Sequence, residues 1–269
     1  MTRLGIIGVG RLGATLLRAA AIHAPEIELT AASRDSARVA ALQREIPGLT
    51  YASPEDLARA ADLIVLCIPP EIYPPLCERI APHLGPDAIV ISVANTVPMS
   101  VIADRVRVPV VRAIPTLAHL VGRGVSLLVA GPGALPGHVD TVRRVFARFS
   151  MPVLIDERDD RVASNVAGSA IALFAALCDA FVTANAARAQ TLERATLDAM
   201  MAETAGAIAA LAQAGHGWDD IVRATATPGG MTHAALDVLS SRFPQIADEM
   251  IEATFERQAA IRKLIGSTS

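Results

Sequence analysis

The chain has 269 residues, of which 52% are hydrophobic but only 3% aromatic, and its formal net charge is −3. This balance excludes nucleic acid as a main partner, because there is no basic excess to neutralise phosphates. The three cysteines show no CxxC spacing and no two of the six histidines stand four residues apart, so neither a disulfide framework nor a metal site is expected. The start MTRLGIIG lacks the layout of a signal peptide, which favours a cytoplasmic protein.

The N-terminal part alternates apolar runs with segments of helical spacing. Its strands are rich in Val, Ile and Leu, which is typical of a sheet buried on both faces. Strands are predicted over residues 3–10, 27–33, 62–69, 88–94, 109–115, 124–131 and 152–156. Helices are predicted over residues 11–24, 35–45, 53–61, 71–84, 98–105 and 138–149. This order predicts an α/β fold, a Rossmann-like doubly wound and mostly parallel sheet.

The C-terminal part, from about residue 161 to 265, shows almost no strand pattern and is rich in alanine. We therefore predict an α/β domain over residues 1–158 and a separate all-α domain over residues 159–269. The run 166–182 raises the question of a membrane span, but its alanines and Asp179 favour a buried helix and no membrane partner. The excess of apolar helix face predicts a homodimer or a higher homo-oligomer, built through residues 161–265.

The first glycines form the sequence 8-GVGRLG-13, which matches G-x-G-x-x-G between a predicted strand and a predicted helix. Gly8 suits a tight turn, Gly10 lets the backbone approach a pyrophosphate, and Gly13 lets the helix pack closely on the strand. The pyrophosphate would then lie over free N–H groups at the helix N-terminus. The alternative is three glycines in an ordinary turn.

The second predicted strand ends at Ser33 and Arg34, where an NAD site would usually carry an acidic residue. A hydroxyl and a cation suit the 2′-phosphate of NADP, so NADP(H) is expected in preference to NAD(H). Asp35 follows, and its position favours the N-cap of the next helix.

Six segments follow one another in a familiar order: GVGRLG at 8–13, SR at 33–34, VLCIPP at 65–70, VRAIPTLAHLVGRGV at 111–125, VASNVAGSA at 162–170 and PGGMTHAAL at 228–236. Along nearly its whole length the chain resembles the pyrroline-5-carboxylate reductase family. Residues 71–84 and the IPT stretch are more similar to the divergent branch found in late-competence operons. The resemblance implies a Rossmann domain, a helical domain through which subunits dimerise, and reduction of the cyclic imine Δ1-pyrroline-5-carboxylate to L-proline with NAD(P)H.

The resemblance also implies roles for single residues. The cofactor phosphates would be held by Gly8, Gly10, Arg11, Leu12 and Gly13. Ser33 and Arg34 would face the adenosine ribose, and the nicotinamide half would lie beside Cys67, Ile68, Pro69 and Pro70. The substrate, a small molecule, would be bound by Gly168, Ser169, Gly229, Gly230 and Thr232. Thr232 is the one catalytic candidate, because its hydroxyl would lie near the ring nitrogen or the carboxylate. A helix break without a ligand is the alternative for the PGG turn.

Three segments depart from the family. Pro69 stands where the family has the lysine of AVKP, 114-IPTLAH-119 replaces MPNTPA, and 167-AGSAIAL-173 replaces SGSGPAY. The last change puts Ile171 in place of a helix-kinking proline, which predicts a straighter helix beside the substrate.

The stretch 111-VRAIPTLAH-119 places an arginine inside an apolar strand. Arg112 is interpreted as structural, paired with a carboxylate or with carbonyl groups, and Thr116 stands where the family has an asparagine. His119 is interpreted as a loop histidine with satisfied hydrogen bonds; the alternative is a general acid near the cofactor.

Three functions remain open from the sequence. They are a pyrroline-5-carboxylate reductase, a related NADP-dependent reductase of another imine or carbonyl compound, and a non-catalytic dinucleotide-binding regulatory protein. A dehydrogenase that uses a lysine is disfavoured, because the only lysine of the chain is Lys263.

Overall fold

The computed structural model of the chain describes residues 2–266. Its backbone divides into two compact units. Unit 1 contains the residues up to Gly168 together with the segment from Ile261 onward, and unit 2 contains Ser169–Ala260. The domain limits inferred from the sequence, 1–158 and 159–269, stay a prediction.

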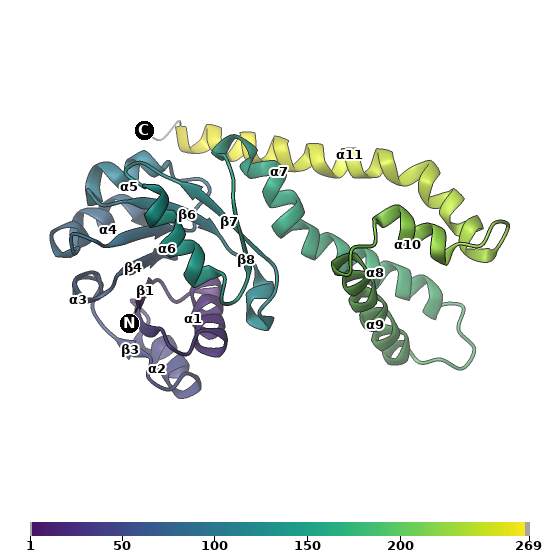
Figure 1. Ribbon diagram of the computed structural model, residues 1–269, viewed down its shortest axis with the longest axis horizontal. Helices are drawn as coiled ribbons and strands as arrows, with labels where there is room; N and C mark the ends of the chain where they lie inside the picture. The colour runs from purple at the N-terminus through teal and green to yellow at the C-terminus, as the bar shows by residue number, and fades with distance from the viewer. Residues whose placement is uncertain (1, 267–269) are drawn as a thin grey trace. The chain divides into compact units, whose positions relative to one another are not determined.

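Unit 1 is built around one sheet of eight strands in the order β3-β2-β1-β4-β5-β6-β7-β8 (Figure 1). Pairing is parallel throughout except between β6 and β7, which run antiparallel. The predicted α/β fold with a mostly parallel sheet is therefore confirmed. The strands are β1 (Arg3–Ile7), β2 (Glu28–Ala32), β3 (Thr50–Tyr51), β4 (Leu63–Leu66), β5 (Ile89–Ser92), β6 (Val110–Ile114), β7 (Val125–Ala130) and β8 (Met151–Leu154).

Helices cover both faces of this sheet, because consecutive strand residues point to opposite sides. On β4, Leu63 and Val65 join one buried apolar cluster, and Ile64 and Leu66 join the other. The first cluster includes side chains of α1 (Arg11–His23), α2 (Ser36–Glu45) and α6 (Pro136–Phe146). The second includes side chains of α3 (Pro54–Ala60), α4 (Tyr73–Ile80) and α5 (Met99–Val106).

Local signals in the sequence account for several helix ends. The Asp35 carboxylate accepts a hydrogen bond from the backbone N–H of Arg38 at 3.0 Å, which confirms the predicted N-cap. Ser53 caps α3 in the same way, with Pro54 in its first turn. The predicted helix 71–84 is instead α4 flanked by two short 3-10 turns, Pro70–Ile72 and Ala81–His83. Its prolines lack the N–H groups that a longer α-helix would need.

The two edge strands of the sheet differ from the sequence prediction in length. The short β3, with both residues exposed, was not predicted because two residues carry no periodicity. At the other edge, the backbone N–H groups of Met151 and Ile155 bond to carbonyls on the β7 side. Pro152 and Leu154 therefore face outward, and only Leu154 offers an N–H group to a further strand.

Unit 2 is helical, as predicted for the C-terminal part. Short turns, Glu157–Asp159 and α7 (Asp160–Ser164), precede it in unit 1 and lead into a π-helical turn at Asn165–Ser169. The helices that follow are α8 (Ala170–Ala186), α9 (Arg194–Gln213), α10 (Trp218–Thr225) and α11 (Met231–Gly266), the last of which extends beyond unit 2.

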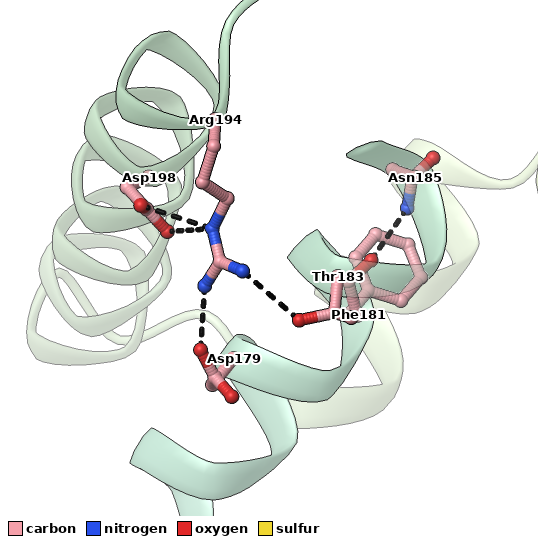
Figure 2. A network of polar contacts seen from close by, with 6 residues as sticks. All are labelled: Asp179, Phe181, Thr183, Asn185, Arg194 and Asp198. Carbon is pink, nitrogen blue, oxygen red and sulfur yellow. Dashed lines mark hydrogen bonds and ion pairs between the residues drawn. The ribbon is translucent and has the colours of Figure 1, made fainter. Parts of the chain in front are cut away.

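An arginine joins the two helices that begin unit 2 (Figure 2). Arg194 lies in the first turn of α9, where its Nε donates to Asp198 at 2.9 Å on the same helix. Its Nη2 pairs with Asp179 at 2.5 Å and its Nη1 donates to Thr183 at 3.0 Å, both on α8. All these groups are partly exposed, so the network adds little to the free energy of unfolding. Its main effect is to hold α8 and α9 in one relative orientation.

Burial of α8 was predicted from its apolar sequence, and this prediction is wrong for the single chain. Only Val182 of α8 is buried, whereas Phe174 and Phe181 are 63% and 62% exposed. The continuous helical stretch Glu157–Ala186 is long and apolar enough to cross a membrane by length and composition, and 6% of its most apolar window is buried. Most of the large apolar side chains of α8 are thus exposed in the single chain, a pattern that is typical of an interaction surface.

Candidate functional site

A cleft of about 610 Å³ opens at the carboxyl ends of β1, β2 and β4. Strand β1 lies between β2 and β4, so the winding of the chain reverses direction there. Ligands of doubly wound sheets bind at such a reversal point. The cleft is lined by Ile7, Gly8, Val9, Gly10, Ala32, Ser33, Arg34, Asp35, Arg38, Tyr51, Ser53, Pro54, Glu55, Cys67, Ile68, Pro69, Ile72, Leu76 and Arg79.

The three motif glycines occupy three different environments. Gly8 has φ = 100°, and a Cβ there would lie 2.2 Å from the carbonyl oxygen of Cys67. A Cβ on Gly13 would lie 2.0 Å from the carbonyl oxygen of Gly8, because α1 packs directly on the turn. At Gly10 a Cβ would meet nothing within 4 Å, so this position faces open space in the cleft. The cradle thus leaves room where a pyrophosphate would lie.

The N-terminus of α1 completes this cradle. Gly10 is its N-cap and supplies no side chain, and the first turn contains no acidic residue. The first N–H groups of the helix therefore have no capping partner from the N-cap side chain, and the helix dipole favours an anion there. Of the residues predicted to hold the phosphates, Arg11, Leu12 and Gly13 are not among those that line the cleft. Gly13 acts through packing, and the roles of Arg11 and Leu12 stay predictions.

The end of the cleft beside β2 carries more positive charge than the sequence indicated. Ser33 and Arg34 both line it, and Ser33 Oγ accepts the backbone N–H of Asp35 at 3.1 Å. Arg38, in the first turn of α2, lines it too and donates from Nη1 to the carbonyl oxygen of Val9 at 3.4 Å. The predicted N-cap at Asp35 was a usable signal for Arg38. A residue three positions after the cap lies in the first helical turn, at the same end of the helix as Ser33 and Arg34.

The two arginines lead to a test of cofactor choice. Replacing both Arg34 and Arg38 by alanine is expected to weaken NADPH binding by about 10- to 100-fold, from the loss of charge-assisted hydrogen bonds to the 2′-phosphate. NADH binding should change by less than about threefold, because NADH lacks that phosphate. Dissociation constants from calorimetric titration would check this. An equal loss for both dinucleotides would contradict a 2′-phosphate contact.

The chain that leaves β4 forms an apolar wall of the cleft. Cys67, Ile68 and Pro69 line it, whereas Pro70 begins the 3-10 turn and does not. That the nicotinamide lies beside these residues stays a prediction. Burial raises the pKa of the Cys67 thiol to about 12, so this cysteine is a packing residue and not a nucleophile at neutral pH. Within residues 2–266 no three His, Cys, Asp or Glu side chains gather as metal ligands would.

A buried tyrosine, which was not predicted from the sequence, joins the ends of β4 and β5. The Tyr73 hydroxyl donates to the carbonyl oxygen of Leu66 at 2.7 Å. Ser92 Oγ donates to that hydroxyl at 3.3 Å and accepts the backbone N–H of Ala94 at 3.3 Å. Burial raises the Tyr73 pKa to about 12, so the hydroxyl keeps its proton. The two chain segments beside the cleft are thereby held in a fixed register.

Arg112 has the structural role that was predicted for it. Its side chain is 1% exposed on β6. Nη1 pairs with Glu157 at 2.6 Å and Nη2 donates to the carbonyl oxygen of Val97 at 2.6 Å. One guanidinium therefore joins three segments: the strand itself, the loop after β5, and the connection that leads from β8 to α7.

His119 is a loop histidine with satisfied hydrogen bonds, as interpreted from the sequence. The ring is fully buried, and its Nδ1 lies 3.1 Å from the carbonyl oxygen of Arg123. Nε2 accepts the backbone N–H of Thr116 at 3.2 Å and lies 2.8 Å from the Ser126 hydroxyl. Nδ1 therefore carries the proton. Burial lowers the pKa of His119, and a histidine held neutral in this way is not a general acid.

This depressed pKa predicts a dependence of stability on pH. Below pH 6.5 the unfolded chain binds a proton at His119 that the folded chain excludes, so the free energy of unfolding falls as the pH drops. The slope contributed by this group approaches about 1.4 kcal/mol per pH unit until the folded pKa is reached. Melting temperatures between pH 5 and 7.5 should fall more steeply for the wild type than for His119→Gln. Replacing the exposed His216 in the same way is the control, and equal slopes in all three proteins would contradict the assignment.

The residues predicted to bind substrate lie in two places. Gly168 and Ser169 belong to the π-helical turn. Gly229, with φ = 71°, and Gly230 form the turn before α11, which begins at Met231 with Thr232 exposed in its first turn. The PGG segment therefore does open a helix, as the anion-binding interpretation requires, but its role in substrate binding stays a prediction.

Ile171 in place of a proline predicted a straighter helix, and this prediction is only partly confirmed. Ile171 lies inside an uninterrupted α8, but the turn that precedes it, Asn165–Ser169, is π-helical. A π-turn inserts one extra residue into the helical ladder and distorts it without any proline.

Comparisons with known proteins match both parts of the chain. Residues 3–96 match the family model described as NADP oxidoreductase coenzyme F420-dependent, and residues 157–261 match that of pyrroline-5-carboxylate reductase dimerisation. Pyrroline-5-carboxylate reductase 3 of Bacillus subtilis is 23% identical over 99% of both chains. Along nearly its whole length the chain is therefore similar to pyrroline-5-carboxylate reductases.

Further proteins are similar to the chain to a comparable degree. The Pseudomonas aeruginosa reductase is 24% identical over 98% of both chains, and ComE operon protein 4 of Bacillus subtilis is 26% identical over 68% of both. The solved structure of the Plasmodium falciparum pyrroline carboxylate reductase, which has NADP bound, aligns with a TM-score of 0.82 at 21% identity over 97% of this chain and 98% of that one. The Coxiella burnetii structure aligns at 0.84 with 19% identity and the same coverage. The fold is therefore that of the family, and the activity is supported as that of an NAD(P)-dependent oxidoreductase.

Proposed function

We propose that this protein reduces the cyclic imine Δ1-pyrroline-5-carboxylate to L-proline with NADPH. One observation carries the proposal: a glycine cradle and cleft for a dinucleotide lie in a chain whose relatives at full length are named for this reaction. We place the cofactor across residues 1–158 and the substrate with residues 159–269.

The cofactor, when bound, supplies a hydride to the imine carbon, and the nitrogen already carries the proton that completes the amine. The protein's own residues therefore need only bind, orient and exclude water. Gly8 and Gly10 admit the pyrophosphate, and Cys67, Ile68 and Pro69 keep the nicotinamide side dry. We assign the substrate carboxylate to the N–H groups that begin α11, after Gly229 and Gly230, with Thr232 as a hydrogen-bond donor from its hydroxyl.

Two measurements test the activity itself. NADPH oxidation should follow addition of Δ1-pyrroline-5-carboxylate to the purified protein, with L-proline as the product. The Thr232→Val variant should bind NADPH unchanged but turn over at least about tenfold more slowly, because it loses a hydrogen bond made at the reacting ring. Binding of NADPH without turnover of this imine would overturn the proposal.

A second candidate, reduction of a different imine, is favoured by one observation. Two of the three altered segments, 114–119 and 167–173, lie outside the glycine cradle, which is itself intact, and the second of them contains Gly168 and Ser169, which we assign to the substrate. A panel of cyclic imines of different ring size and substitution separates the two candidates. The candidate whose imine shows the higher kcat/KM is retained.

We also propose that the protein is a cytoplasmic homodimer or a higher homo-oligomer assembled through residues 161–265. The exposed apolar side chains of α8, including Phe174 and Phe181, support it, and so does the dimerisation family model that spans them. Sedimentation equilibrium at micromolar concentration should give at least twice the 28.1 kDa mass of the chain. Phe174→Glu together with Phe181→Glu should dissociate the assembly, whereas the same change at the exposed Met151 of unit 1 should not. A monomeric wild type would contradict the proposal.

A further inference from the structure

An amide oxygen without a donor lies in the loop that follows β5. Asn95 Oδ1 is shielded from solvent and has no hydrogen-bond partner among the described residues. An unpaired buried acceptor destabilises a fold by about 1–3 kcal/mol, which makes it a feature that needs an explanation. Asn95 belongs to the loop 93–98, which lies entirely within unit 1.

The loop cannot easily move to satisfy this oxygen, because it is anchored on both sides. Before Asn95, the backbone N–H of Ala94 donates to Ser92 Oγ at 3.3 Å, and this Oγ donates in turn to the Tyr73 hydroxyl. After it, the carbonyl oxygen of Val97 is held by the buried Arg112 at 2.6 Å. The Asn95 amide group is thus held by a rigid segment, as is expected of a preorganised ligand-binding group.

Strand register places Asn95 next to the apolar wall of the cleft. Leu66 of β4 pairs with Ser92 of β5, and Ser92 pairs with Arg112 of β6. Three residues beyond Ser92 comes Asn95, and three residues beyond Leu66 comes Pro69, which lines the cleft. Asn95 itself does not line the cleft. Because neighbouring strands lie about 5 Å apart, we expect the Asn95 loop to run beside the Cys67–Pro69 segment, on the side away from β1.

The order of the strands tells which part of a dinucleotide reaches that point. Ser33 and Arg34 mark the adenosine end over β2, and Gly8 and Gly10 mark the pyrophosphate over β1. The second nucleoside then continues past β4 toward β5. Its nicotinamide ring carries a carboxamide, which has two N–H donors at the ring edge.

We infer that Asn95 accepts a hydrogen bond at Oδ1 from the carboxamide N–H of the nicotinamide, and so fixes the rotation of the ring. This inference rests on the proposed dinucleotide site. It explains why an unpaired acceptor persists in a loop that two buried residues hold still. Asn95 is a positioning residue, because it sets which face of the ring meets the substrate without touching the transferred hydride.

The experiment compares NADPH with its reduced 3-acetylpyridine analogue, in which a methyl group replaces the carboxamide NH2. Dissociation constants are measured by calorimetric titration without substrate, so turnover plays no part. The wild type should prefer NADPH, and Asn95→Ala should reduce that preference by about 3- to 10-fold, the equivalent of one hydrogen bond. Asn95→Asp, which keeps an acceptor oxygen, should retain the preference. Thr96→Val in the same loop is the matched control and should leave it unchanged.

A stability measurement separates this role from a structural one. Because Oδ1 has no partner within the protein, Asn95→Ala should keep or raise the melting temperature of the cofactor-free protein. A preference for NADPH that is the same in wild type and Asn95→Ala would overturn the inference, and so would a marked fall in melting temperature. A wild type that binds neither dinucleotide would overturn the proposed function as well, whereas equal binding of both would overturn the inference alone.

Discussion

Replacing Gly13 by alanine is expected to unfold unit 1 at temperatures where the wild type is stable. The new Cβ would lie 2.0 Å from the carbonyl oxygen of Gly8, a backbone atom inside a tight turn that cannot move aside. Either α1 must lift off the sheet or the turn must open, and we expect a loss of about 3–5 kcal/mol in the free energy of unfolding. Urea denaturation followed by circular dichroism measures it.

Gly10→Ala is the matched control and is expected to separate folding from binding. Its Cβ would meet no protein atom within 4 Å, so the melting temperature should stay within about 2 °C of the wild type. The added methyl group would, however, occupy the space where a pyrophosphate approaches the backbone. NADPH affinity should therefore fall by about 10-fold or more. Equal destabilisation by the two substitutions, or an unchanged affinity in Gly10→Ala, would contradict this division of roles.

Replacing Arg112 by methionine is expected to cost about 2–4 kcal/mol of stability. Methionine fills part of the volume, but the buried carbonyl group of Val97 loses its donor and Glu157 loses its partner. Arg112→Lys should recover only part of the loss, because a single ammonium group cannot reproduce the two-sided contact of a guanidinium. Chemical denaturation of both variants provides the measurement.

The control for Arg112 is an arginine of the same unit that pairs on the surface. Arg3 pairs with Asp62, and both side chains are substantially exposed. Arg3→Met should change the unfolding midpoint far less than Arg112→Met, because water replaces the lost contact. If the two substitutions cost the same, Arg112 is not the central support of this part of the sheet.

The parts of this protein that the sequence predicts well are those decided by neighbours in the chain. The cap at Asp35, the turn at Gly8 and the start of α11 after Gly230 each follow from a few consecutive residues. The apolar strands carry their own pattern, so the order of elements and the parallel sheet could be derived without coordinates. The cradle of the candidate site belongs to this class, because one short motif forms it.

The parts that the sequence does not predict depend on contacts between distant segments. Nothing near Tyr73 in the chain indicates that its hydroxyl would join the ends of β4 and β5. The buried state of His119 depends on Ser126 and on the turn at Arg123, which fix the proton on Nδ1. The exposure of α8 is a further case. Composition predicts that the helix is apolar, but it does not predict whether the apolar face packs inside the same chain.

The two edges of the sheet have a consequence for how this protein can associate. One edge is the two-residue β3, and on the other Pro152 removes one of the two outward N–H groups of β8. Neither edge can recruit a long backbone ladder from another copy. Any assembly must then be held by side chains, mainly those on helices, and its strength can be tuned one residue at a time. Reversible subunit exchange is open to such a protein, and growth into fibrils from the native sheet is blocked.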